Sequence, residues 1–145
     1  MSLQVFSHVA LACREPIVTE RFHQQYFGFR RARVVPLPDG GEIVFLKMQD
    51  CLFYLELFKA TETSPVLLPV KDGPMYPGIR HLAFKVVDVD AKLAEIGEQA
   101  KVTLGPASFE AFIPGWKTVW IADPDGNIVE ISQGFTDQSA EEMGA

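Results

Sequence analysis

The sequence predicts an α+β fold built from two similar modules, and three observations lead to this prediction. The same order of elements, a strand, a helix and then three strands, occurs twice. Each half has a histidine on its first strand and a glutamate on its last. Between the halves, residues 59–78 contain four prolines and two glycines, which do not suit a regular element. We therefore expect one domain over residues 1–145, with module one at 3–58, a linker, module two at 79–133 and a C-terminal tail at 134–145.

The first strand of module one is predicted over residues 3–12, where successive side chains would point to opposite faces of the strand. Val9 and Leu11 share one face, which suits packing under a helix. His8 lies on the other face among alanines, and these small neighbours leave room for a ligand. A histidine inside an apolar strand needs a partner that satisfies its polar atoms.

A helix is predicted from Pro16 to about Phe27, because proline is tolerated in the first turn and Gly28 is a natural stop. Its buried stripe is expected at four-residue spacing. The residues of this stripe are Val18, Phe22 and Tyr26. His23 lies beside the stripe and is expected to be a solvated helix histidine.

Three strands follow in module one, and three follow the helix of module two. They are predicted near residues 31–37, 42–48 and 51–58, and near 101–104, 116–122 and 127–133. In the third of these strands Glu56 faces away from Leu55 and Leu57. In the last strand Glu130 shares a face with Ile128 and Ser132. Each glutamate is therefore expected to face the same side of its sheet as the histidine of its module.

Module two begins with a strand over residues 79–87, where His81 has Ala83 as a neighbour, just as His8 has Ala10. Asp88 is a suitable N-cap for a short helix over residues 89–96. The two halves together predict curled sheets that pair into a cupped mixed sheet, with the helices on the convex face. The four inward-facing side chains would then converge.

Bulk properties exclude several classes of function. The net charge of −6 argues against nucleic-acid binding. No apolar run approaches the roughly 20 residues needed to cross a bilayer, and the N-terminal residues lack the pattern of a signal peptide. Two cysteines, Cys13 and Cys51, do not form a disulfide framework. We expect a soluble, cytoplasmic protein whose partner is a small molecule.

The spacing of four residues indicates a metal site. His8 precedes Glu56 by 48 residues, and His81 precedes Glu130 by 49 residues. Two imidazoles and two carboxylates suit a divalent transition metal. A lone buried glutamate is costly, whereas two glutamates and two histidines around one cation satisfy one another.

Five segments of the chain resemble the vicinal oxygen chelate superfamily, which includes glyoxalase I, the bleomycin-resistance proteins and the extradiol dioxygenases. The segments are SHVALAC, HQQYFGF, FYLELF, GIRHLAFKVVDVDA and WIADPDGNIVEI. The resemblance implies paired βαβββ modules around a metal whose ligands are His8, Glu56, His81 and Glu130. Among the members, the sequence is most similar to glyoxalase I, whose bacterial form has the same two histidines and two glutamates.

Two positions differ from glyoxalase I. Its glutathione is held by an arginine four residues after the first histidine and an asparagine four residues after the first glutamate. Here Ala12 and Ala60 occupy these positions, so we expect a substrate other than the usual glutathione hemithioacetal. An Fe(II) extradiol-type dioxygenase and a non-catalytic, bleomycin-resistance-like binding protein are the alternatives.

The resemblance implies a lyase or isomerase reaction in which the metal ion, as Lewis acid, stabilises an enediolate of a small oxygenated substrate. Glu56 or Glu130 would act as the general base. The ion would be Ni, Co, Mn, Fe or Zn. Members often form dimers in which modules pair across subunits, so a homodimer is expected, and pairing within one chain stays open.

Overall fold

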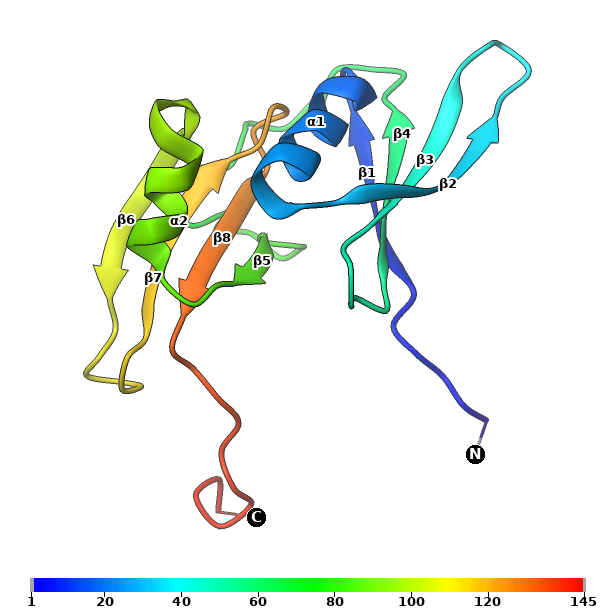
Figure 1. Ribbon diagram of the computed structural model, residues 1–145. Helices are drawn as coiled ribbons and strands as arrows, with labels where there is room; N and C mark the ends of the chain where they lie inside the picture. Colours follow the sequence, from blue (N-terminus) through cyan, green and yellow to red (C-terminus); the bar gives the residue numbers. More distant parts are fainter. Residues whose placement is uncertain (1, 145) are drawn as a thin grey trace. The chain divides into compact units, whose positions relative to one another are not determined.

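The computed structural model describes residues 2–144 of the chain. It divides into two compact units, Met1–Leu67 and Leu68–Ala145, and each is described by itself. Each unit contains one module with the element order βαβββ and a four-stranded mixed sheet (Figure 1). The predicted fold class of two βαβββ modules is confirmed.

In module one the sheet order is β1-β4-β3-β2. The elements are β1 His8–Cys13, α1 Pro16–Phe27, β2 Arg30–Pro36, β3 Glu42–Lys47 and β4 Tyr54–Lys59. The first strand runs parallel to the last, whereas the other neighbours are antiparallel. This order follows from the helical crossover, because parallel neighbours need a long connection and antiparallel neighbours need only a turn.

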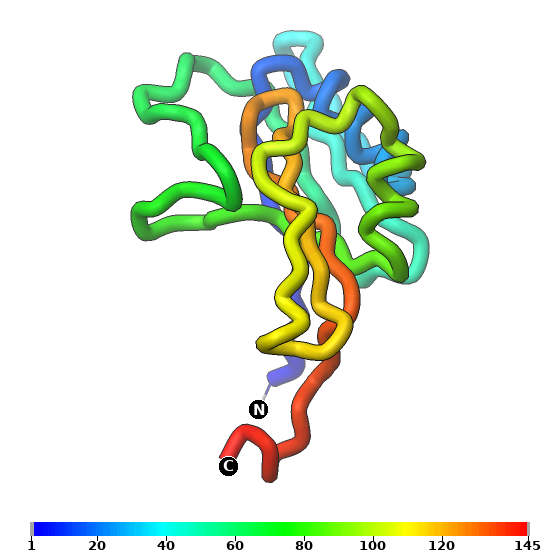
Figure 2. The backbone as a smooth tube through the Cα atoms, turned by 90° about the vertical axis from the view of Figure 1, so that its left-hand side faces the viewer, coloured from blue at the N-terminus to red at the C-terminus, as the bar shows by residue number. Residues whose placement is uncertain are grey.

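Module two repeats this topology with the sheet order β5-β8-β7-β6. Its elements are β5 Leu82–Lys85, α2 Val89–Ile96, the short 3₁₀-helix η1 Gly97–Gln99, β6 Val102–Ser108, β7 Lys117–Ala122 and β8 Ile128–Gln133. Again the first strand runs parallel to the last. Figure 2 shows β6, in yellow, running beside β7, in orange.

Both helices begin and end where the sequence predicts. Pro16 opens α1, and Gly28 ends it in the left-handed conformation with φ of 70°. Asp88 caps α2 by accepting a hydrogen bond from the Ala91 N–H at 2.9 Å. Each helix packs on one face of its own sheet, α1 on β1 and β4 and α2 on β7 and β8.

The first strand of each module is shorter than predicted. Strand β1 begins at His8 because its partner strand begins at Tyr54, which pairs with His8. In the same way β5 has four residues, Leu82–Lys85, which are those that pair with β8. A ladder of hydrogen bonds needs a partner along its whole length, so His81 lies immediately before β5.

The cores of the two modules lie between sheet and helix. In module one the fully buried strand residues include Leu46, Leu55 and Leu57. Module two has a corresponding set, which includes Val119, Ile121, Val129 and Ile131. The predicted alternation in β4 is therefore confirmed, since Glu56 lies between two buried leucines and faces the other side.

The buried face of α1 differs from the prediction. Its buried residues are Thr19, Glu20, Phe22 and His23, whereas Val18 is 45% exposed. The expectation of a solvated His23 is wrong, because this side chain is fully buried. His23 packs against the rings of Phe22, Phe27 and Phe29, and Glu20 turns inward to meet Arg31 of β2. Arg31 donates to both Glu20 carboxylate oxygens, at 2.6 and 2.8 Å.

Two further observations concern membranes and cysteines. None of the helices within residues 2–144 is long and apolar enough to cross a membrane. Neither Cys13 nor Cys51 forms a disulfide within residues 2–144.

Candidate metal centre and substrate pocket

A row of side chains crosses the sheet of module one on the face away from α1. Ala10 pairs with Glu56, Glu56 pairs with Phe45, and Phe45 pairs with Arg33. Residues directly opposite each other on neighbouring strands point to the same face. One residue from each of the four strands therefore contributes to this row.

The corresponding row of module two reads Ala83, Glu130, Trp120 and Leu104. The internal repeat thus extends beyond the histidines and glutamates. An alanine and a glutamate stand at matching positions, an aromatic residue follows, and the fourth position differs. Arginine occupies it in module one and leucine in module two.

Within module one, His8 and Glu56 form a close pair. The His8 Nε2 atom lies 3.2 Å from Glu56 Oε2. The Ser7 hydroxyl lies 2.9 Å from His8 Nδ1, and the Phe45 ring meets the imidazole edge-on at 6.2 Å. The His8 side chain is 44% exposed and that of Glu56 only 12%. Solvent therefore reaches this pair from the side of the histidine.

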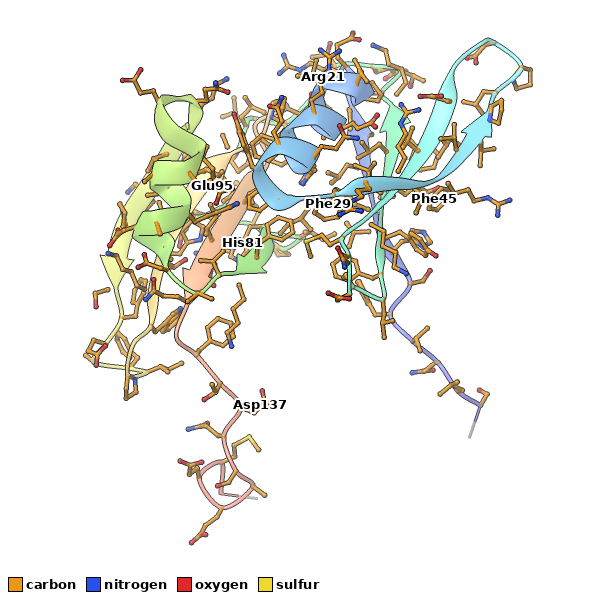
Figure 3. All side chains as sticks on the ribbon, in the orientation of Figure 1. Arg21, Phe29, Phe45, His81, Glu95 and Asp137 are labelled. Carbon is orange, nitrogen blue, oxygen red and sulfur yellow. The ribbon has the colours of Figure 1, made fainter. Side chains whose placement is uncertain are left out.

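Within module two, His81 and Glu130 form the matching pair (Figure 3 labels His81). The His81 Nε2 atom lies 2.9 Å from Glu130 Oε2. The same oxygen accepts a hydrogen bond from the buried Trp120 indole N–H at 3.1 Å. The Asp72 carbonyl oxygen lies 3.2 Å from His81 Nδ1. Glu130 and His81 are therefore each held by one further contact.

The hydrogen-bonding roles in module two fit a cation. A carbonyl oxygen only accepts, so His81 Nδ1 is the donor toward Asp72. In a neutral imidazole Nε2 then carries a lone pair, which faces another acceptor, Glu130 Oε2, at 2.9 Å. Two acceptors facing each other repel, and either a proton on Nε2 or a cation bound between the two atoms removes this repulsion. A donor contact from the second ring nitrogen to a carbonyl is the usual support of a metal-bound histidine.

The distances also suit metal ligands. Two donor atoms that each lie about 2.1 Å from one ion, at a right angle, are about 3.0 Å apart. The two histidine–glutamate pairs have separations of 3.2 and 2.9 Å. The residues present therefore fit a divalent ion by donor chemistry and by spacing within each pair.

The four residues predicted from the sequence occur as two pairs, one in each module. Among residues 2–144 no group of three or more His, Cys, Asp or Glu side chains stands close enough to hold a metal ion. The structure thus describes two separate histidine–glutamate pairs. The joining of His8 and Glu56 with His81 and Glu130 stays a prediction.

A pocket of about 440 Å³ adjoins the His8 side chain in module one. Its lining comes from β1, β2, β3, β4 and the residue before β1. These residues are Ser7, His8, Ala32, Arg33, Phe45 and Tyr54. Figure 3 labels Phe45 on β3. The pocket places a hydroxyl, a cation and two aromatic rings beside the candidate ligand.

Sequence reasoning missed several of these residues. Trp120 lies in a buried apolar strand and gives no polar signal of its own, although its register opposite Glu130 could have identified it. Arg33 lies in a strand with three arginines, and nothing in the sequence separates its role from the others. Asp72 acts through its backbone carbonyl, which leaves no sequence signal.

Comparison with known proteins places the chain in a family. A model described as Glyoxalase/Bleomycin resistance protein/Dioxygenase superfamily matches residues 5–131. No curated protein matches the chain.

Solved structures of similar fold include proteins of different kinds. A glyoxalase family protein from Enterococcus faecalis is 28% identical, with a TM-score of 0.66 over 91% of this chain and 99% of that chain. TnmS3, an antibiotic binding protein from Streptomyces sp. CB03234, is 22% identical, with a TM-score of 0.66 over 93% and 99%. FosX, a fosfomycin resistance protein from Listeria monocytogenes solved with Mn(II) and sulfate, is 15% identical, with a TM-score of 0.62 over 99% and 100%. With the family model covering most of its length, this chain belongs to the glyoxalase, bleomycin-resistance and dioxygenase superfamily.

Proposed function

We propose that this protein is a metal-dependent lyase or isomerase of the glyoxalase type. His8, Glu56, His81 and Glu130 would hold one divalent ion, chosen from Ni, Co, Mn, Fe or Zn. One observation carries this proposal. Each module presents a histidine nitrogen and a glutamate oxygen, 3.2 and 2.9 Å apart, at matching positions of the repeat. Two such pairs supply the donor set of a transition metal.

When bound, the ion would supply a Lewis acid that stabilises negative charge on two adjacent oxygens of the substrate. The protein's own residues would divide the remaining tasks. His8 and His81 stay ligands, because Ser7 and the Asp72 carbonyl contact their second nitrogens.

The surroundings of the two glutamates assign them different roles. Glu130 Oε2 receives the Trp120 N–H as well as the His81 contact, which supports the role of a ligand for this carboxylate. Glu56 has Phe45 at the matching position, and a phenyl ring donates no hydrogen bond. Glu56 also contacts His8, which lines the pocket. We therefore assign Glu56 as the general base.

The reaction follows from this assignment. Glu56 would take a proton from the carbon next to a carbonyl, giving an enediolate, and return it to the neighbouring carbon. Substrate and product then have the same composition, and no oxidant or reductant is needed. Ala12 and Ala60 stand where glyoxalase I holds glutathione, so the substrate is a small oxygenated molecule other than the usual hemithioacetal.

A ligand-binding protein without catalysis is the second candidate. The pocket of module one, with Phe45 and Tyr54 in its wall, favours it, because aromatic side chains and a few polar groups are typical of small-molecule sites. Binding of a small molecule that is unaffected by chelators, without any turnover, would favour this candidate.

Two isosteric variants test the enzymatic proposal. Chelator-stripped protein is reloaded with each candidate metal, and loss of the C–H signal of small hydroxyketones in D₂O is followed by proton NMR. Because the base would be partly released from the ion, Glu56→Gln should weaken metal binding less than Glu130→Gln does, and should lose about a hundredfold or more in exchange rate. Glu130→Gln should weaken metal binding itself. Full activity of the stripped protein would contradict the proposal, and oxygen uptake with catechols would favour a dioxygenase instead.

A further inference from the structure

We propose that the pocket of module one binds an acidic group of the substrate, a carboxylate or a phosphonate, and that Arg33 is the residue that recognises it. This inference rests on the proposed function for the identity of the reacting end. The recognition itself depends only on residues of module one, so it can be tested independently of catalysis.

A β-bulge directs Arg33 into the pocket. In β2, Arg31 pairs with Leu46 and Arg33 pairs with the adjacent residue, Phe45, so that Ala32 is an extra residue in the ladder. In a regular strand Arg31 and Arg33 would share a face. The bulge instead leaves Arg31 on the face of Leu46, under α1, and turns Arg33 to the face of Phe45.

Of the three arginines in β2, Arg31 has its charge compensated, whereas Arg30 meets only a neutral amide and Arg33 forms no ion pair within residues 2–144. Arg31 binds Glu20 and Glu42. Arg30 donates a hydrogen bond to Gln49 at 3.4 Å. Arg33 is exposed and forms no ion pair with any residue between positions 2 and 144. A free guanidinium in a chain of net charge −6 is suited to an anionic ligand, since it binds carboxylate and phosphonate oxygens with two parallel donors.

The rest of the pocket defines the class of ligand. Phe45 and Tyr54 meet edge-on at 6.0 Å and form its apolar wall. Ser7 and His8 line it together with Arg33. A volume of about 440 Å³ suits a small organic molecule. The ligand would place its acid group on Arg33 and its apolar part on the rings, with its other end toward His8 and Glu56.

The repeat shows that this feature belongs to module one alone. The position matching Arg33 in module two is Leu104, which pairs with Trp120 as Arg33 pairs with Phe45. Because only the row of module one has a cation at this position, the substrate would bind in one orientation. The acid end would lie in module one, on the side of the proposed base.

The test compares acids with a neutral analogue of the same shape. Binding of 3-phenylpropionate, 2-phenylethylphosphonate and 3-phenylpropanamide to the full chain is measured by calorimetry, with Zn(II) and again after chelation. At least one acid should bind about threefold to tenfold tighter than the amide. Arg33→Gln should remove this difference, Arg33→Lys should keep part of it, and Arg30→Gln should leave it unchanged.

Equal binding of both acids and the amide would overturn the inference, as would an acid preference that survives in Arg33→Gln. A preference that vanishes on chelation would assign the acid to the metal and also overturn it. The proposed function fails separately, if Glu56→Gln and Glu130→Gln change neither exchange nor metal binding. The preferred acid tells whether the natural ligand is of the carboxylate or the phosphonate class.

Discussion

The glutamates of the two histidine–glutamate pairs lie in different surroundings, although the repeat gives them the same register. Trp120 and Phe45 occupy the matching positions beside Glu130 and Glu56. The indole N–H donates to Glu130 at 3.1 Å, and the phenyl ring has nothing to donate. One hydrogen bond donor thus separates a fixed carboxylate from a freer one.

Replacing Trp120 by phenylalanine tests this difference. The change removes the donor but keeps an aromatic ring in the buried strand. Metal affinity should fall about tenfold, as for loss of an outer-shell contact to a ligand, measured by competition with a chromogenic chelator. The matched control is Trp116→Phe, which removes the other tryptophan of module two and should leave metal affinity unchanged. Equal losses in both variants would contradict the role of Trp120.

His23 makes folding stability depend on pH. Burial lowers the pKa of His23 from 6.5 to about 4. Between these values the unfolded chain binds a proton that the folded chain does not, so the free energy of unfolding decreases as the pH falls. Well above pH 6.5 the buried His23 does not lower the free energy of unfolding. At pH 4 it lowers this free energy by about 3 kcal/mol. Urea unfolding between pH 7 and 4 measures it.

His23→Leu should have a flatter profile than the wild type between pH 6.5 and 4. If His23→Leu and the wild type lose stability in parallel, burial of His23 is not the cause.

Among the elements, α1 is attached to β2 by an ion pair that the hydrophobic pattern did not indicate. Glu20 is 3% exposed and accepts hydrogen bonds from both Arg31 and Gln24. The hydrogen bonds to Glu20, more than those to Glu42, raise the pKa of Arg31 above its usual range. The guanidinium therefore stays charged and joins the helix to the edge of the sheet.

Arg31→Met should destabilise module one because it leaves the Glu20 carboxylate buried without its cation. We expect a loss of about 2–4 kcal/mol in the free energy of unfolding. Arg21→Met, on the exposed face of the same helix, should change stability by less than about 0.5 kcal/mol. The double variant Glu20→Leu with Arg31→Met should recover part of the loss. If Arg31→Met leaves the free energy of unfolding unchanged, the ion pair does not hold α1 on the sheet.

At the scale of the whole molecule, residues 66–79, which comprise the end of the linker and the first residue of module two, expose seven large apolar side chains. Each of the following is more than half exposed: Val66, Leu67, Leu68, Val70, Met75, Tyr76 and Ile79. Exposed apolar side chains that lie close together mark interaction surfaces. The expected homodimer stays a prediction.

Mixing two inactive variants would decide how the modules pair. One variant carries His8→Ala and Glu56→Ala, and the other carries His81→Ala and Glu130→Ala. If modules pair across a dimer, mixed dimers contain one site with all four ligands, and a refolded equal mixture should recover about a quarter of wild-type metal binding. Equilibrium dialysis measures this recovery. No recovery would show that the modules pair within one chain.

The sequence alone determined the repeat, both helices with their ends, the strand faces and the four candidate ligands. These features depend on local rules: the period of two in strands, capping residues, and glycine or proline at ends. His8 and Glu56 were recognisable because they interrupt apolar alternation.

Only the tertiary structure showed which residues meet across strands. His23 is buried against the ring of Phe29, which follows the helix, and Glu20 is buried because Arg31, eleven residues away, pairs with it. Arg33 enters the pocket because one extra residue in the ladder reverses its face. Trp120 reaches Glu130 through strand register. These contacts depend on pairing between distant segments, which the local pattern of a single strand or helix does not encode.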